Sequence, residues 1–254
     1  NIRLAAEREG ATFKMGQTIH EIARGATRRF QLSCEGGLCL DADVVINAAG
    51  PYSAHINRMA GVTLPLETRA LRREVHAVSN PVSNEDRVPL PVVGDLDGGV
   101  YFRPEGGAKE IVVGSTDPPC DRFDWVDDPD DYATHLTEAY HRRQVLRLMK
   151  RLPSVRFGPR KGVAALYDVT VKDWYPIVDK TDESGFYVCI GTSGSSFKTS
   201  LVLGQLLAET VTANENGQDT DLHPLDFRLK RVGISVDPSF LSRSRGMLST
   251  TSTV

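Results

Sequence analysis

The sequence predicts an α/β fold with two structural zones, and three observations support this prediction. An apolar run of the buried-strand type, 43–47, ends in a turn of small residues that leads into a helix. Segments such as 71–78 and 110–114 alternate or run apolar between Gly, Pro and Asp, as strands of an antiparallel or mixed sheet do. Leucines recur at helical spacing after a glycine-rich entry, which predicts a last helix at about 196–212.

The remaining elements are predicted from their local patterns. Residues 2–9 mix apolar and charged positions at helical spacing and precede Gly10, which indicates the end of a helix. Residues 127–152 contain no glycine and end before a proline, so one or two helices are expected there. Beyond residue 214 the chain becomes polar, and a tail is expected that is mobile over 242–254.

Composition argues against several classes of protein. The 254 residues carry 30 basic and 33 acidic side chains, and the basic ones are dispersed, so no nucleic-acid-binding surface is indicated. The four cysteines form no Cys-x-x-Cys pair, so neither a zinc site nor a disulfide framework is expected, and a reducing setting, cytoplasmic or in an organelle matrix, fits best. No apolar run approaches the roughly 20 residues that cross a bilayer, so no membrane span is expected.

The most informative stretch is 187–198, where an apolar strand leads into two glycines, three serines and then a helix. Several backbone N–H groups and a helix N-terminus converge there, and such a place binds partial negative charge. Lys198 adds a full positive charge. This environment suits the pyrimidine edge of a flavin, which becomes negative on reduction. As an isolated pattern, a glycine- and serine-rich helix entry is more often a capping turn than a cofactor site, and a lysine there is more often a surface residue.

At this point the chain resembles the glycine/D-amino-acid oxidase family of flavoproteins. Members of that family carry a strand ending in GLYDVTPD, a PIIG-like strand, and a turn and helix that read GFSGHGFK. This sequence has ALYDVT at 165–170, PIV at 176–178 and GTSGSSFK at 191–198, in the same order. Upstream, ADVVINAAGPYS at 42–53 is similar to the family's ADVVVNAAGPWS, and YFRPEGG at 101–107 is similar to its YFRPEGGG hairpin.

The resemblance implies oxidation of a carbon–nitrogen bond by FAD, with hydride transfer to flavin N5. By the family pattern, Lys198, Tyr101 and Tyr167 are the expected catalytic residues, although ordinary core packing explains each tyrosine equally well. The residues expected to bind the cofactor are Ile19, Ala48, Gly50, Gly191, Ser193, Gly194, Ser195, Ser196, Phe197 and Lys198. Noncovalent FAD is expected, because Ala165 stands where some N-methyl amino-acid oxidases carry a cysteine bonded to the flavin.

The implied architecture is a partial FAD-binding domain of the glutathione-reductase-like type beside a substrate domain of the α+β type with a mixed or antiparallel sheet. Residues 1–63 and 185–213 are expected to form the former, 64–184 the latter, and 214–254 the tail. The chain crosses twice between the two domains. Two family positions differ, since Ser195 and Ser196 replace the histidine and glycine of the family's turn.

The sequence nowhere contains Gly-x-Gly-x-x-Gly, the turn that holds a dinucleotide pyrophosphate. It begins with neither a methionine nor a signal peptide, and it is expected to be the carboxyl-terminal portion of a longer protein. An amino-terminal FAD-binding segment or a partner subunit is therefore the expected partner, besides the small-molecule substrate. Exposed apolar surface is expected where that missing part packs.

Two functions of different class stay open. The leading one is an FAD-dependent oxidase or dehydrogenase of an N-methylated or secondary amino acid such as sarcosine or dimethylglycine, with glycine or a primary D-amino acid as the runner-up. The alternative is a catalytically inactive, flavin-free fragment or scaffold subunit, which the missing dinucleotide motif and the Ser195-Ser196 replacement favour. A serine hydrolase is disfavoured, because the turn at 193–196 does not form Gly-x-Ser-x-Gly.

Overall fold

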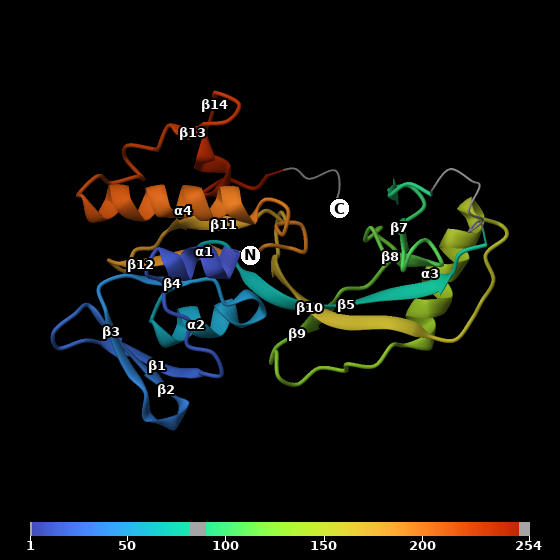
Figure 1. Ribbon diagram of the computed structural model, residues 1–254, viewed down its shortest axis with the longest axis horizontal. Helices are drawn as coiled ribbons and strands as arrows, with labels where there is room; N and C mark the ends of the chain where they lie inside the picture. Colours follow the sequence, from blue (N-terminus) through green and yellow to red (C-terminus); the bar gives the residue numbers. More distant parts are fainter. Residues whose placement is uncertain (1, 82–89, 249–254) are drawn as a thin grey trace.

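The computed structural model describes residues 2–81 and 90–248, which form two lobes joined by a long two-stranded ribbon (Figure 1). The ribbon consists of β5 (Thr68–Ser79) and β10 (Lys161–Thr170), which pair antiparallel over the full length of β10. This pairing carries the chain out of one lobe and back into it. The structure is of the α/β class with antiparallel and mixed sheets, as the sequence predicts.

The first lobe is built on a three-stranded sheet in the order β11-β12-β4. Here β12 (Phe186–Ile190) pairs antiparallel with β11 (Ile177–Lys180) and parallel with β4 (Val45–Asn47). Successive side chains of a strand point to opposite faces. Tyr187 therefore packs with the leucines of α4 (Ser200–Glu215), whereas Val188 faces the other side.

That other side is covered by α2 (Ser53–Met59) and by a small antiparallel sheet. The small sheet consists of β1 (Ile19–Arg24), β2 (Phe30–Cys34) and β3 (Cys39–Ala42), with a short 3-10 turn, η1 (Glu35–Gly37), between the last two. Phe30 and Phe186 meet edge to face with ring centroids 6.1 Å apart. The short helix α1 (Ile2–Arg8) opens the described chain and buries none of its residues.

The second lobe is an antiparallel sheet covered by one helix, α3 (Glu138–Arg151). Its strands are β5, β10, β6 (Val93–Asp95), β7 (Val100–Glu105), β8 (Glu110–Gly114) and β9 (Asp124–Val126). Val145 and Leu148 of α3 are fully buried against the apolar side chains of β7 and β8. The prediction of strands in this zone is confirmed by these elements.

The helix expected over 127–152 is shorter in the structure. Only α3 forms, and it begins after Thr137, whose hydroxyl accepts the N–H of Tyr140 at 3.3 Å. The preceding residues are not helical, because Arg72 binds the carbonyls of Ala133 and His135 at 2.5 and 2.6 Å. Those carbonyls are thus used in a tertiary contact that periodicity does not reveal.

The prediction of a tail beyond residue 214 is wrong for the described residues. The helix α4 continues to Glu215, and the chain then forms β13 (Phe227–Leu229), β14 (Ile234–Val236) and a 3-10 turn, η3 (Pro238–Leu241). Phe227 and Leu241 are buried against α4. Of the end expected to be mobile over 242–254, residues 242–245 make hydrogen bonds to the first lobe, and residues 249–254 lie outside the described residues.

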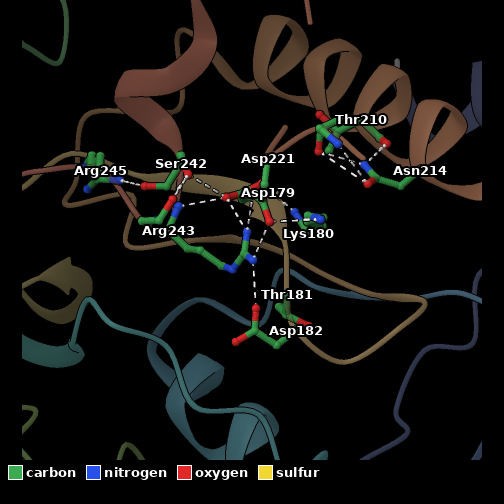
Figure 2. Close-up of polar contacts among 12 residues, drawn as sticks. Asp179, Lys180, Thr181, Asp182, Thr210, Asn214, Asp221, Ser242, Arg243 and Arg245 are labelled. Atoms are coloured by element: carbon green, nitrogen blue, oxygen red, sulfur yellow. Dashed lines mark hydrogen bonds and ion pairs between the residues drawn. The ribbon is translucent and has the colours of Figure 1, made fainter. Parts of the chain in front are cut away.

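Arg243 holds this last segment in place. It is 7% exposed and its guanidinium contacts the carboxylates of Asp179, Asp182 and Asp221 at 2.8–3.2 Å (Figure 2). Asp179 lies on β11, so the C-terminal segment is anchored to the sheet of the first lobe. Because β11 pairs with β12, residues 177–180 belong to this sheet, although the expected substrate-domain range of 64–184 includes them.

Within residues 2–81 and 90–248, no helix has both the length and the apolar character needed to cross a membrane.

Candidate active site

The two turns that the sequence singles out lie at the same edge of the first lobe's sheet. Strands β4 and β12 are parallel neighbours, with Val45 opposite Phe186 and Asn47 opposite Val188. Their carboxyl ends therefore lead side by side into the turn that contains Gly50 and into the turn that begins at residue 191. In open α/β sheets, ligands bind outside the carboxyl ends of parallel strands.

The turn of residues 191–199 requires its glycines. Gly191 has φ 67°, and a Cβ there would lie 2.0 Å from Oγ1 of Thr170. Gly194 has φ 77°, and a Cβ there would lie 2.3 Å from the ring of Tyr167. Ser193 also adopts a left-handed conformation, with φ 50°, and is only 4% exposed. The helix α4 starts at Ser200 rather than near residue 196, because these residues form turns instead.

Backbone donors remain available in this turn. The N–H of Ser193 donates to the carbonyl of Asp168 at 2.7 Å, and that of Ser195 donates to Thr192 at 3.1 Å. Among the described residues, no acceptor binds the N–H groups of residues 196–198. Three consecutive donors can therefore bind an acceptor that comes from outside this part of the chain.

A pocket of about 390 Å³ lies between this turn and the ribbon. Both predicted tyrosines line it, Tyr101 from β7 and Tyr167 from β10, together with Lys198. Ser193, Gly194, Ser195 and Phe197 complete the wall on the side of the turn. The backbone makes room for each ring at a glycine, since a Cβ on Gly114 would lie 2.5 Å from the ring of Tyr101.

The remaining predicted cofactor residues do not line this pocket. Ala48 and Gly50 lie at the neighbouring strand end, while Gly191 and Ser196 belong to the turn but do not line the pocket. Ile19 lies apart, at the start of β1, where it packs against the core of the first lobe. The structure therefore brings together the three predicted catalytic residues and four predicted cofactor residues besides Lys198.

Tyr101 keeps its proton at neutral pH. Burial raises the pKa of Tyr101 to about 12, and it also raises the pKa of Tyr140, which lies near Arg73 and Asp117. A protonated phenol is a hydrogen-bond donor. Tyr101 is thus suited to donate to a carboxylate or carbonyl in the pocket rather than to act as a base.

Several charged residues at this site were not predicted from the sequence, among them Arg73, Asp117 and Asp168. Arg73 and Asp117 line the pocket and form an ion pair, with side chains 8% and 3% exposed. Asp168 lies behind the turn, where its carboxylate accepts the N–H of Gly191 at 2.5 Å. The only sequence signal for Arg73 is the charged triplet Arg-Arg-Glu at 72–74, inside the strand-like run 71–78.

Asp168 is 4% exposed, and burial raises its pKa to about 7 although the backbone N–H groups of Gly191 and Thr192 lower it. Its strand, β10, also contacts the short 3-10 turn η2 (Gly50–Tyr52), which follows β4. Asp168 therefore lies close to both turns at the sheet edge.

Comparison with known proteins agrees with this geometry. Residues 1–210 match the DAO family, described as FAD dependent oxidoreductase. A mouse (Mus musculus) protein, FAD-dependent oxidoreductase domain-containing protein 1, is 28% identical over 184 residues, which are 67% of this chain and 36% of the mouse protein. The chain thus spans about a third of that curated relative.

Two solved structures are similar in fold. Glycine oxidase from Geobacillus kaustophilus superposes with a TM-score of 0.64 at 18% identity, over 85% of this chain and 53% of the oxidase. L-proline dehydrogenase from P. horikoshii gives a TM-score of 0.66 at 18% identity, over 83% of this chain and 53% of the dehydrogenase. With the match of residues 1–210, the chain belongs to the family of FAD-dependent oxidoreductases.

Proposed function

We propose that the pocket beside the 191–199 turn is the active site of an FAD-dependent enzyme that oxidises a carbon–nitrogen bond of an amino acid or secondary amine. The observation that carries this proposal is that the turn, Lys198 and two buried tyrosines meet in one pocket of about 390 Å³. N-methylated amino acids such as sarcosine and dimethylglycine are the leading substrates, and glycine or a D-amino acid is the second choice.

The residues present fit one part of FAD. The backbone comes close to the pocket at Gly194, and the N–H groups of residues 196–198 are available donors beside the Lys198 ammonium. Together they complement the partial negative charge of a flavin's pyrimidine edge. FAD, when bound, would supply the hydride acceptor. This sequence contains no Gly-x-Gly-x-x-Gly motif, so a segment or subunit outside this chain would hold the pyrophosphate.

The chain's own residues would bind and orient the substrate. Tyr101 and Tyr167 would donate to the substrate carboxylate or shape the amine site, and burial of Tyr101 keeps its proton in place. Lys198 would neutralise negative charge at the flavin edge or on the substrate. The cofactor would be noncovalent, since Ala165 of β10 offers no nucleophile.

A visible absorption spectrum tests this proposal. The protein is purified as this chain and in its longest natural form, and each is mixed anaerobically with sarcosine, dimethylglycine, glycine or a D-amino acid. We expect flavin bands that bleach with one of these substrates. A Lys198→Met variant should bleach more slowly, whereas Lys172→Met, an exposed lysine that does not line the pocket, should not. Absence of flavin from both forms would refute the proposal and favour the flavin-free scaffold.

A further inference from the structure

We infer that Asp168 is a positioning residue that joins the two turns at the sheet edge and takes up a proton when the flavin is reduced. This inference rests on the function proposed above, because it needs a flavin in front of the 191–199 turn. The carboxyl group of Asp168 lies behind that turn and does not line the pocket, so the inference involves no contact with the substrate.

The carboxyl group of Asp168 reaches both turns. It accepts the N–H of Gly191 at 2.5 Å, at the start of the 191–199 turn. The N–H of Thr192 and the hydroxyl of Ser53 act on the same carboxylate and favour its charged form. Ser53 is fully buried at the start of α2, directly after η2. One carboxyl group is thus held by both of the segments that follow the parallel strands β4 and β12.

The main chain holds the 191–199 turn independently of this side chain. The N–H of Ser193 donates to the carbonyl of Asp168 at 2.7 Å, and Val169 and Thr192 form an isolated β-bridge. A substitution of the Asp168 side chain leaves these backbone contacts in place. The effect of its charge can therefore be separated from the placement of the turn.

The charge of Asp168 is not balanced by a cation. Among the described residues, no lysine, arginine or histidine forms an ion pair with this side chain, which belongs to a residue only 4% exposed. On the adjacent strands, β5 places Ala70 opposite it, and β12 presents the thiol of Cys189, whose pKa is raised by burial and by the charge of Asp168. From α2 it meets the hydroxyl of Ser53. Burial without an ion pair raises the pKa of Asp168 to about 7, so the group exchanges its proton near neutral pH.

Reduction of a flavin changes the charge in front of this carboxyl group. The hydride from the substrate brings two electrons and one proton, and the pyrimidine edge of the flavin gains one negative charge. A carboxylate behind the turn repels that charge across a buried region of low dielectric constant. When Asp168 takes up a proton from water, it becomes a neutral carboxylic acid and the repulsion ends. The substrate supplies both electrons, so the protonation of Asp168 needs no further oxidant or reductant.

The reduction potential of the flavin should therefore depend on Asp168. Above about pH 7 the carboxylate is charged and makes the flavin harder to reduce, whereas at lower pH the neutral acid has no such effect. Above this pH each pair of electrons is accompanied by two protons instead of one. The potential should then fall with pH about twice as steeply as it does at lower pH.

Spectroelectrochemical titration of the flavin at pH values from 5 to 9 tests this inference, with the protein in its longest natural form. The slope of the wild-type profile should change near pH 7. Asp168→Asn, which resembles the neutral acid in size and shape, should keep the shallower slope throughout and have a more positive potential than wild type at pH 8. Asp127→Asn is the matched control and should follow wild type, because it removes an equal charge from a side chain that is 95% exposed.

A second variant, Ser53→Ala, distinguishes a shifted proton from a damaged turn. Its loss of the hydroxyl removes a group that favours the charged form of Asp168, so the change of slope should move to higher pH by about one unit. A purely structural defect would weaken flavin binding without moving the change of slope. Infrared difference spectra give a second readout at pH 8, where reduction should produce the C=O band of a carboxylic acid in wild type but not in Asp168→Asn.

The inference is overturned if the potential of Asp168→Asn follows the wild-type profile, if Asp127→Asn changes that profile equally, or if Ser53→Ala leaves the change of slope in place. Flavin content, measured by absorption, reports separately on the proposed function. A flavoprotein whose potential does not depend on Asp168 would refute this inference alone. A protein without flavin would refute the proposed function on which the inference rests.

Discussion

Among single residues, Gly194 shows how closely the turn and the ribbon fit together. Its φ of 77° strains any other residue, and a Cβ would lie 2.3 Å from the ring of Tyr167. We expect Gly194→Ala to lower the free energy of unfolding by roughly 2–4 kcal/mol, from the left-handed backbone and the clash together. Urea unfolding measures this change, and loss of flavin should accompany it.

The control for this variant is Gly204→Ala. Gly204 lies inside α4, where no atom is within 4 Å of the added Cβ. Alanine should stabilise that helix by up to about 1 kcal/mol. If both variants changed stability in the same direction and by the same amount, the close approach of Tyr167 to Gly194 would not matter to the fold.

Asp168 should make stability depend on pH. Its pKa in the folded protein is about 7, above the ordinary value of 3.8, so the folded state binds more protons between these values than the unfolded state does. The stability that protonated Asp168 contributes is therefore fully present below about pH 4 and is lost as the pH rises to 7. A shift of about three units corresponds to roughly 4 kcal/mol at most.

We expect Asp168→Asn to flatten this dependence. Unfolding midpoints measured at pH 5 and pH 8 should differ less in the variant than in wild type. Asp127→Asn, at an exposed carboxylate, serves as the control and should keep the wild-type slope. An unchanged slope in Asp168→Asn would show that another group titrates.

The residues of the site differ in how far the sequence could predict them. Gly191, Gly194 and Lys198 lie in one short motif, so a local pattern is enough to find them. Arg73 and Asp117 are 44 positions apart and meet only because β5 and β8 pair and place the loop after β8 beside β5. No local sequence pattern reveals how β5 and β8 align, so the pairing of Arg73 with Asp117 could not be predicted.

Among the elements, the C-terminal segment is fixed by charge rather than by apolar periodicity. Because polar residues dominate this segment, the sequence predicts a tail. In the structure its arginines form ion pairs with carboxylates that lie far away in the sequence. Arg245, for example, donates to both oxygens of Asp173 at 2.9 Å. Composition reports how many charges a segment has but not which partners they find. The same reason explains the missing helix at 127–137, where Arg72 holds the backbone.

We expect Arg243→Ala to destabilise the protein by about 3–5 kcal/mol. The substitution leaves Asp179, which is 7% exposed, without its buried cation, and breaking a buried pair costs about that much. Thermal and urea unfolding give the magnitude, and limited proteolysis should cut first after residue 215. Lys161→Ala removes an exposed ion pair with Glu110 and should cost less than about 1 kcal/mol. Similar losses in the two variants would contradict the anchoring role.

For the whole molecule, the arrangement of the lobes decides where the site lies. The pocket takes Arg73 and Tyr167 from the ribbon, Tyr101 from the second lobe and Lys198 from the first. Neither lobe contains the site by itself. Alternation and turn patterns predict the lobes' strands, but the site depends on the long pairing of β5 with β10, in which Leu71 lies opposite Tyr167.

The sheet of the first lobe also has an open edge. Among the described residues β4 pairs with β12 alone, and Ile46 on this strand is 47% exposed. Phe197, in the turn before α4, and Leu201, in the first turn of α4, are 95% and 67% exposed. The open edge of a strand that carries an exposed apolar side chain is a place where another strand adds. We therefore expect a segment from outside the described residues to pair with β4.

This expectation can be measured by comparing this chain with its longest natural form. The longer form should melt at a higher temperature and bind less of a dye that reports exposed apolar surface, because pairing covers the edge. Ile46→Glu should abolish that gain and leave the melting temperature of the shorter chain nearly unchanged, since the side chain is already half exposed there. Ile234→Glu, at a 57% exposed position on β14, should leave the gain intact. If the higher melting temperature of the longer form survived Ile46→Glu but not Ile234→Glu, the docking surface would lie on the C-terminal segment and not at β4.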